Sequence, residues 1–333
     1  MGKVSIVVPF KNTSKFLVDC LESIQNQTYQ EWEVLAVNDG STDPSAAVVS
    51  RFAQKDGRIR CFDNKGKGII PALQTAYGYA SGNYITRMDS DDIMKTRRLE
   101  LMVNALQQKG VGHIAVGQVA YFSDQGISNG YQRYEAWLNQ LTKKGANFIE
   151  IYKECVIPSP CWMVHVEDFE RCGGFEHNRY PEDYDLTFRF YQEGLQVIPC
   201  KEVLHLWRDY PTRTSRTHLH YAQNYFLDIK LYYFLKLHYT PNRALVIWGA
   251  GFKGKQIAKS LVEKKIDFTW LCDNPKKIGK KIYGQPLHHF SKLTALNEPQ
   301  SIITVANTIA QKEIRQYLDA LSQHPMEDYY FFC

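Results

Sequence analysis

The sequence lacks the features that mark several large classes of protein. No apolar run is long enough to cross a bilayer, and the opening residues MGKVSIVVPF lead directly into a predicted strand rather than a cleavable signal segment. Eight cysteines are present, but none forms a CxxC pair, and their spacing matches neither a disulfide framework nor a zinc knuckle. We therefore expect a cytoplasmic protein with reduced thiols and no transmembrane segment.

A strong excess of charge is also missing. The formal net charge is +5, and basic residues alternate with acidic ones along most of the chain, so a nucleic-acid partner is not indicated. The one basic cluster, at residues 276–281, is read as a solvated loop or as a contact for an anionic ligand. With 44% hydrophobic and 23% charged residues in 333, the chain is typical of a folded protein of about two domains.

The first hundred residues alternate between strand and helix patterns. Strands are expected at Val4–Val8, Glu33–Val37, Ile59–Phe62 and Tyr84–Met88, and helices at Phe16–Tyr29 and Pro71–Ala80. Such alternation predicts an α/β fold with a twisted, mainly parallel sheet. Ligands bind beyond the carboxyl ends of the strands in these sheets, so Asp39 and Asp89, which follow two of them, are the first candidate site residues.

The pattern restarts near residue 241. Ala244–Trp248 is expected to form a strand, Lys255–Glu263 a helix and Phe268–Cys272 another strand, which together make a second α/β unit. Residues 217–239 favour a helix rich in Tyr, Phe and Leu. We therefore predict a first domain over residues 1–216, a linking helix over 217–240 and a smaller Rossmann-like domain over 241–333.

Three carboxylates crowd into four residues at Asp89-Ser90-Asp91-Asp92. Like charges this close raise one another's pKa unless a cation compensates, and a divalent cation with oxygen ligands can hold a diphosphate at the same time. The alternative is a helix start, where Asp satisfies free amides. We interpret Asp89 and Asp91 as metal ligands, whereas Asp92 fits the helix start, with Arg98 as an ion-pair partner.

Five segments of the sequence resemble, in order and interval, the motifs of family 2 glycosyltransferases. They are Val7-Val8-Pro9-Phe10-Lys11-Asn12, Val37-Asn38-Asp39-Gly40-Ser41-Thr42-Asp43, Ala80-Ser81-Gly82-Asn83-Tyr84-Ile85, Asp89-Ser90-Asp91-Asp92 and Pro181-Glu182-Asp183-Tyr184-Asp185-Leu186. The resemblance covers residues 3–216. Within the family, the chain is most similar to the β-1,3-N-acetylglucosaminyltransferase-like proteins, a likeness that includes Trp137-Leu138-Asn139-Gln140-Leu141 and Ile247-Trp248-Gly249-Ala250-Gly251.

This resemblance implies a GT-A fold and inverting transfer of a sugar from a nucleotide-diphosphate donor to a hydroxyl of a glycan or other acceptor. The donor is usually linked to UDP, and UDP-GlcNAc is the first candidate. The implied donor-binding residues are Pro9 and Phe10 at the nucleobase, Asp39 on the uracil ring, Asp89 at the ribose, Ser90, and Arg208 near the diphosphate. Asp89 and Asp91 would bind Mn²⁺ or Mg²⁺.

The implied general base is Asp183. An inverting single displacement needs one such base, unlike the paired carboxylates of hydrolases. The alternative is that Asp183 only caps a helix that starts after Pro181. The chain departs from the family pattern at Ser14, where an acidic residue is common, and at Leu73-Gln74, where an Arg-Asn pair is common.

The C-terminal part contains a second recognisable pattern. Gly249, Gly251 and Gly254 form GxGxxG between a strand and a helix, and Asp273 lies 19 residues after Gly254. This spacing matches the dinucleotide-binding fingerprint with its ribose-binding acid. It leaves open a bifunctional, NAD-linked protein, a non-redox domain that recognises a nucleotide, or a contact between copies in a homo-oligomer. A sugar-nucleotide-binding module without activity is a third possibility, which the complete set of Asp89, Asp91 and Asp183 disfavours.

Overall fold

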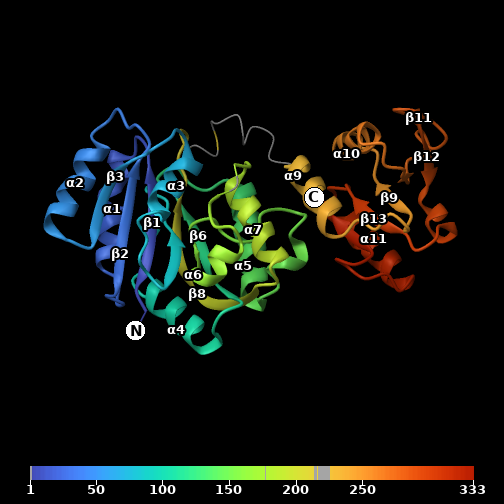
Figure 1. Cartoon of the computed structure of the whole chain (residues 1–333). Coiled ribbons are helices and arrows are strands. Elements are labelled where there is room, and N and C mark those ends of the chain that lie inside the picture. The colour runs from blue at the N-terminus through green and yellow to red at the C-terminus, as the bar shows by residue number, and fades with distance from the viewer. Residues whose placement is uncertain (1, 177, 214–215, 217–225) are drawn as a thin grey trace. The chain divides into compact units, whose positions relative to one another are not determined.

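The computed structural model describes residues 2–176, 178–213, 216 and 226–333, which form two compact units. The first unit comprises Met1–Phe148 and Val156–Ala222, and the second comprises Ile149–Cys155 and Gln223–Cys333. Figure 1 draws the elements of the first unit in blue to yellow and those of the second mainly in orange to red. The eight cysteines are all unpaired in this structure.

An eight-stranded sheet organises the first unit, in the order β3-β2-β1-β4-β7-β6-β8-β5. Its strands are β1 (Val4–Phe10), β2 (Trp32–Asn38), β3 (Ile59–Asp63), β4 (Tyr84–Arg87), β5 (Ile93–Met94), β6 (His113–Phe122), β7 (Trp162–His165) and β8 (Gln196–Arg208). The first four run parallel, and β6 is parallel to β8. Strands β5 and β7 are antiparallel to their neighbours, so the sheet is mixed.

Helices connect these strands and pack beside the sheet in the first unit (Figure 1). They are α1 (Ser14–Gln25), α2 (Ser45–Lys55), α3 (Ile69–Tyr77), α4 (Arg98–Lys109), α5 (Asn129–Lys144), α6 (Val166–Arg171) and α7 (Glu182–Gln192), with a 3₁₀ turn at Asn147–Glu150. Strand β1 is buried along its whole length, as its continuous apolar run predicts for a central parallel strand. The core beneath it includes apolar residues of α1 and α4, so the carboxyl ends of β1, β2 and β4 rest on a rigid base.

The second unit has a six-stranded sheet in the order β11-β12-β10-β9-β13-β14. Its elements are α9 (Leu227–Leu237), β9 (Leu245–Trp248), α10 (Phe252–Glu263), β10 (Thr269–Cys272), β11 (Lys281–Ile282), β12 (Gln285–His289), a 3₁₀ segment at Phe290–Ala295, β13 (Gln300–Ile303), α11 (Thr308–Ala320) and β14 (Tyr329–Phe331). Five neighbouring strands of this sheet run parallel to one another, namely β12, β10, β9, β13 and β14. The chain changes direction across the sheet between β9 and β13, as in a doubly wound fold.

The second unit contains more of the chain than the sequence pattern indicated. Helix α9, predicted to link two domains, buries Ile229 and Phe234 and belongs to this unit. The segment Ile149–Cys155, predicted to lie in the first domain, also belongs here, because Tyr152 stacks on Phe332 with ring centroids 5.2 Å apart. Residues 217–225 of the predicted linker lie outside the described residues. No helix in the part of the chain described is long and apolar enough to span a membrane.

Candidate active site

Asp39 lies just beyond the end of β2, at the carboxyl edge of the parallel strands. Its Oδ1 accepts hydrogen bonds from Asn64 Nδ2 at 2.6 Å and from the Gly68 amide at 2.8 Å. Its Oδ2 lies 3.3 Å from Lys11 Nζ. The carboxylate is therefore fixed by the loops that follow β1 and β3, and its Oδ2 has room to accept a further hydrogen bond.

The two residues expected beside a nucleobase are part of β1. Pro9 is buried, and the ring of Phe10 is 2% exposed and belongs to the hydrophobic core. Only the backbone of Phe10 reaches toward Asp39, through a hydrogen bond of 2.9 Å from the Asp39 amide to the Phe10 carbonyl. The expectation that Pro9 and Phe10 line the nucleobase pocket stays a prediction, and in this structure the alternation of the strand turns the Phe10 ring toward the core.

Arg87 connects the end of β4 to the start of α7. Its Nε lies 2.8 Å from Asp89 Oδ1, and its NH1 lies 2.9 Å from Glu182 Oε1. Burial would raise the pKa of Asp89, but Arg87 first and Arg213 second outweigh it and hold this pKa below its ordinary value. Asp89 is therefore ionised, and Asp183 follows Glu182 directly in the chain.

Asp183 lies in the first turn of α7, after the N-cap residue Pro181. Its Oδ1 accepts a hydrogen bond of 2.8 Å from the Tyr184 amide. Burial raises the pKa of Asp183 to about 7, and the charge of Glu182 adds to the rise while Arg87 opposes it. A carboxylate with a pKa near neutrality is suited to take a proton from a hydroxyl group.

Asp91 is buried and held by residues that follow β8. The hydroxyl of Tyr210 donates a hydrogen bond of 2.8 Å to Asp91 Oδ2, and Arg213 Nε lies 3.9 Å from the same oxygen. Burial raises the pKa of Asp91 to about 6, with Asp92 adding to the rise and Arg213 opposing it. The carboxylate is thus crowded by negative charge and open to stabilisation by a cation.

Asp92 does not start a helix, contrary to the sequence-based interpretation. It precedes β5, and α4 begins only at Arg98. Asp92 Oδ2 lies 2.9 Å from His205 Nε2, and the other ring nitrogen accepts a hydrogen bond of 3.1 Å from Arg98 NH1. Because Arg98 must donate, Nδ1 of His205 must accept, and Nε2 carries the proton that it donates to Asp92.

This arrangement gives His205 a supporting role. Burial, with Arg98 next, holds the pKa of His205 well below its ordinary value, so the ring is neutral. Both of its nitrogens are engaged, which leaves none for a metal ion. A hydrogen-bonded chain of three buried side chains, Asp92, His205 and Arg98, supports the acidic loop, defined here as residues 89–92.

Ser90 and Arg208 also support this loop. Ser90 Oγ lies 3.0 Å from Thr13 Oγ1. Arg208 donates from Nε to the Asp91 carbonyl at 2.8 Å and from NH2 to Asp19 Oδ2 at 2.8 Å. Its guanidinium also packs over the Phe16 ring at 4.7 Å. In this structure Arg208 therefore fixes the loop of Asp91 to α1.

Asp89 and Asp91 are compatible with a divalent cation that also contacts a diphosphate. Among the residues that the structure describes, no group of three or more His, Cys, Asp or Glu side chains is placed to hold a metal ion alone. Mg²⁺-type ions do not require such a cage, since one or two carboxylates commonly hold them and phosphate oxygens and water complete the coordination. Burial raises the pKa of Asp91 and the charge of Asp92 adds to the rise, and a bound cation would offset both by stabilising the ionised carboxylate.

At the two departures from the family pattern, the structure shows a backbone contact at Ser14 and side-chain roles at Leu73-Gln74. The Ser14 amide donates to Asp43 Oδ2 at 3.0 Å where α1 begins. Leu73 is fully buried in α3, and Gln74 Nε2 donates to the Phe175 carbonyl at 2.9 Å. Gln74 therefore ties α3 to the segment that leads toward α7.

Sequence reasoning missed Tyr210, Arg213, Arg87 and Asn64. Tyr210 and Asp91 are separated by 119 positions, so no local spacing relates them. Arg213 follows Arg208 in a short basic stretch, and that stretch was the one available signal for it. Arg87 directly precedes Met88 and the acidic residues. An arginine at the end of an apolar strand segment, close to carboxylates, was the sequence signal for an ion pair at this position.

In the second unit, the glycine-rich loop follows β9 and leads into α10, with Gly251 at the N-cap. Gly249 has a φ of 110°, which favours glycine, and a Cβ on Gly254 would lie 2.1 Å from the Gly249 carbonyl oxygen. Gly251 has open space where a Cβ would be, and Asp273 is exposed after β10. Lys277 Nζ donates to the Ala250 carbonyl at 2.8 Å, so this residue of the basic cluster contacts the loop.

Carboxylates lie at the ends of β2 and β4, and a further carboxylate lies at the start of α7. A model of Glycosyl transferase family 2 matches residues 5–173, and the chain belongs to this family. The glycosyltransferase GlyG of Streptococcus pneumoniae serotype 4 is 31% identical over 215 residues, which cover 62% of this chain and 70% of that protein. GlyA of the same organism is 35% identical over 122 residues, and the match spans only 17% of its length.

Solved structures support the fold. TarS 1-349 of S. aureus, in complex with UDP-GlcNAc, aligns with a TM-score of 0.56 and 16% identity over 78% of this chain and 71% of that one. The mannosyltransferase PcManGT of Pyrobaculum calidifontis, in complex with GDP-Man and Mn²⁺, aligns with a TM-score of 0.52 and 20% identity over 79% of this chain and 75% of that one. The expected GT-A fold is confirmed, and the chain is a glycosyltransferase of this family.

Proposed function

We propose that the protein is an inverting, metal-assisted glycosyltransferase that transfers a sugar from a UDP-sugar to an acceptor hydroxyl. Within the family, we assign it to the β-1,3-N-acetylglucosaminyltransferase-like group, with UDP-GlcNAc as the first donor to test. The observation that carries the proposal is the Arg87 bridge, which joins Asp89 to Glu182 beside Asp183. Arg87 therefore links Asp89, proposed to hold the donor side, to the helix turn that carries Asp183.

The donor would lie across the carboxyl ends of the parallel strands. Asp39 has the position and the hydrogen-bonding capacity to accept from a ring N–H of uracil. Asp89 and Asp91 would hold Mn²⁺ or Mg²⁺, which would supply charge stabilisation for the leaving diphosphate. Arg213, 3.9 Å from Asp91 Oδ2, brings a positive charge to the same region.

Asp183 would act on the acceptor. Displacement of UDP from the anomeric carbon requires removal of the proton from the attacking hydroxyl, and one carboxylate is enough for an inverting reaction. The pKa of Asp183, raised to about 7, makes this carboxylate a stronger base than an ordinary aspartate. The Arg87 contact with Glu182 fixes the helix start that carries it.

The metal role is tested by the affinity for UDP. Calorimetry should show that UDP binds at least about tenfold more tightly with Mn²⁺ than with EDTA, because the cation offsets repulsion between the diphosphate and the two carboxylates. Asp91→Asn should remove most of the Mn²⁺ benefit. Asp267→Asn, an exposed aspartate of the second unit, is the matched control and should behave as wild type. Equal affinity with Mn²⁺ and EDTA in the wild type would contradict a metal at this site.

A second candidate function is nucleotide binding by the second unit, including NAD binding in a bifunctional protein. It is favoured by the strand order β12-β10-β9-β13-β14, which corresponds to the first five strands of the dinucleotide-binding fold, and by Asp273 at the end of β10. It is not supported by the family match, which covers residues 5–173 and does not extend to this unit. We therefore rank it below sugar transfer.

A further inference from the structure

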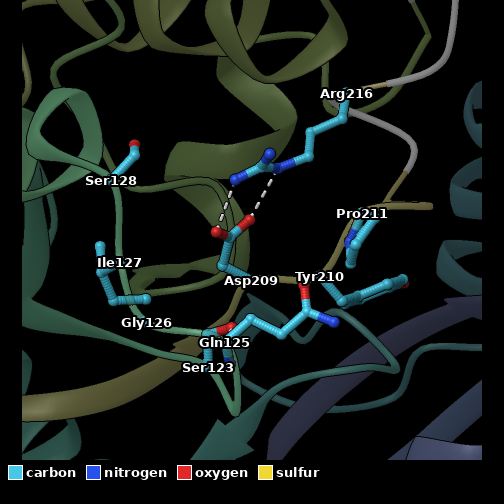
Figure 2. Close-up of a pocket in the computed structure, with 9 residues that line it drawn as sticks. All are labelled: Ser123, Gln125, Gly126, Ile127, Ser128, Asp209, Tyr210, Pro211 and Arg216. Carbon is cyan, nitrogen blue, oxygen red and sulfur yellow. Dashed lines mark hydrogen bonds and ion pairs between the residues drawn. The ribbon is translucent and has the colours of Figure 1, made fainter.

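A cavity of about 350 Å³ lies in the first unit, beyond the ends of β6 and β8 (Figure 2). Its wall is formed by the loop from β6 to α5 and by the segment after β8, and the lining residues are Ser123, Gln125, Gly126, Ile127, Ser128, Asp209, Tyr210, Pro211 and Arg216. Strands β6 and β8 end side by side, with Phe122 opposite Arg208. A hydrogen bond of 2.9 Å from the Asp209 amide to the Phe122 carbonyl closes this end of the cavity wall.

We propose that this cavity binds the acceptor, and that the acceptor presents an uncharged, hydroxyl-rich sugar residue to it. The assignment rests on the proposed transfer from a nucleotide sugar. Its first support is position, because Tyr210 lines the cavity and also donates a hydrogen bond to Asp91 Oδ2 at 2.8 Å. A molecule in the cavity is therefore separated from the acidic loop by the thickness of one side chain.

The charges of the cavity cancel. Arg216 donates from Nε to Asp209 Oδ1 at 2.9 Å and from NH2 to Asp209 Oδ2 at 2.6 Å, and Figure 2 shows the two groups facing each other across this pair. The Arg216 guanidinium also packs over the Tyr131 ring at 5.1 Å. A paired arginine of this kind offers little to a phosphate or carboxylate, since each charge is already neutralised by its partner. The cavity thus favours a neutral ligand.

The remaining lining groups match a sugar. Ser123 Oγ accepts from the Gln125 amide at 3.2 Å, and Ser128 Oγ accepts from the Tyr131 amide at 3.4 Å. Each hydroxyl keeps its own proton for a further hydrogen bond. Ile127 and Pro211 add apolar surface. A pocket with apolar walls and a few placed polar groups is typical of a small-molecule site, and a volume near the lower end of the ~300–1,000 Å³ range suits a terminal sugar residue rather than a long glycan.

Gln125 is the residue on which the assignment can be tested. Its side chain extends along the front of the cavity toward Tyr210 (Figure 2). The side-chain amide is exposed and makes no hydrogen bond within the part of the chain that the structure describes. Its replacement therefore changes the cavity without removing a contact that the fold uses.

The experiment uses the full chain with Mn²⁺ and the nucleotide sugar that the wild type hydrolyses fastest among UDP-GlcNAc, UDP-glucose and UDP-galactose. Transfer is measured to the p-nitrophenyl β-glycosides of glucose, galactose and N-acetylglucosamine. Donor hydrolysis without acceptor and UDP affinity are measured in parallel. The variants are Gln125→Trp, which fills the cavity, and Gln125→Ala, with Gln54→Trp on the exposed face of α2 as the matched control.

We expect transfer to at least one of the glycosides. Gln125→Trp should raise the KM for that glycoside by about tenfold or more, and Gln125→Ala by roughly fivefold, the effect of one lost hydrogen bond. UDP affinity and donor hydrolysis should stay within about twofold of the wild type, and Gln54→Trp should change nothing.

Three outcomes would count against the assignment, and they are distinguishable. An unchanged KM in Gln125→Trp would place the acceptor elsewhere. Donor hydrolysis without transfer to any of the three neutral glycosides would overturn the class of acceptor. A wild-type protein that neither binds UDP nor hydrolyses a nucleotide sugar would contradict the proposed function itself, and the acceptor assignment with it.

Discussion

Asp183 combines a place in the first turn of a helix with a pKa raised to about 7, and these two properties suggest different roles. A base acts in the transition state, whereas a helix-capping residue acts on stability. Asp183→Asn keeps the shape of the side chain but cannot take the proton. It should lower kcat by about 10²–10⁴ while UDP affinity stays nearly unchanged. Steady-state kinetics with calorimetry for UDP measure both quantities.

Two other results would change this assignment. Near-wild-type transfer by Asp183→Asn would move the base to another carboxylate of the same turn, Glu182 or Asp185. Loss of folding or of UDP binding would indicate that the residue fixes the start of α7. Asp168→Asn is not a suitable control because Asp168 is buried, so Asp267, an exposed residue of the second unit, is substituted instead.

The raised pKa of Asp183 also predicts a pH dependence. Burial first and Glu182 second favour the protonated form, and a protonated carboxyl cannot act as a base. Because the active form is the deprotonated one, kcat should be highest above pH 7 and should fall as the pH decreases through about 7, approaching about tenfold per pH unit. A profile measured at saturating donor and acceptor tests this. A flat profile down to about pH 5.5 would show that Asp183 keeps an ordinary aspartate pKa or is not the base.

At the residue scale, local sequence explains part of the site. Asp39 and Asp89 follow strands whose carboxyl ends meet at one edge of the sheet, so their position could be predicted from strand order alone. The contact of Tyr210 with Asp91 could not, because it depends on how the end of β8 returns to the acidic loop. The burial of the Phe10 ring is a similar case, since its side in β1 depends on which face of the sheet carries α1.

At the scale of elements, strand positions were predicted more accurately than the unit to which an element belongs. The continuous apolar runs identify β1 and β2 because buried parallel strands need apolar residues on both faces. Helix α9 gave no comparable signal of where it packs. Its Tyr, Phe and Leu residues suit many surfaces, and only the aromatic cluster with Tyr152 and Phe332 shows that it belongs to the second unit.

One buried lysine anchors α9 in that unit. Lys230 Nζ donates to the Lys153 carbonyl at 2.9 Å and to the Phe332 carbonyl at 3.4 Å. Burial lowers its pKa to about 8, although nearby Glu154 opposes the shift. Lys230→Met should lower the free energy of unfolding by about 1–3 kcal/mol, because two buried carbonyls lose their donor and Glu154 loses a cation.

Urea denaturation followed by circular dichroism measures this effect. Lys259→Met is the control, since Lys259 is exposed on α10 and its 3.8 Å pair with Glu263 should contribute less than about 1 kcal/mol. A Lys230→Met protein as stable as the wild type would show that the cost of burying the ammonium group balances its hydrogen bonds.

At the scale of the whole molecule, the chain joins a sugar-transfer unit to a second unit whose parallel strands follow the order of the first five strands of a dinucleotide-binding fold. The fingerprint Gly249-x-Gly251-x-x-Gly254 alone does not establish a cofactor. Gly254 is required by packing, because a Cβ there would lie 2.1 Å from the Gly249 carbonyl oxygen, and Gly249 is required by its φ of 110°. Only Gly251 is left without a structural reason.

We therefore expect the full chain to bind NAD weakly or not at all, with a Kd no tighter than about 1 mM, and to catalyse no hydride transfer. The reason is that backbone conformation and packing already account for Gly249 and Gly254, so the fingerprint alone does not indicate a cofactor, and Lys277 Nζ, 2.8 Å from the Ala250 carbonyl, already contacts this loop. Calorimetry with NAD, and absorbance assays for its reduction, measure the two activities. The Lys277→Ala variant distinguishes a blocked NAD site from a missing one. NAD binding that appears only in this variant would mean that Lys277 obstructs a loop that is able to bind the cofactor. The opposite result would be micromolar NAD binding and hydride transfer by the wild type, both abolished by Gly251→Trp. That result would make the protein bifunctional and would rank nucleotide binding above sugar transfer.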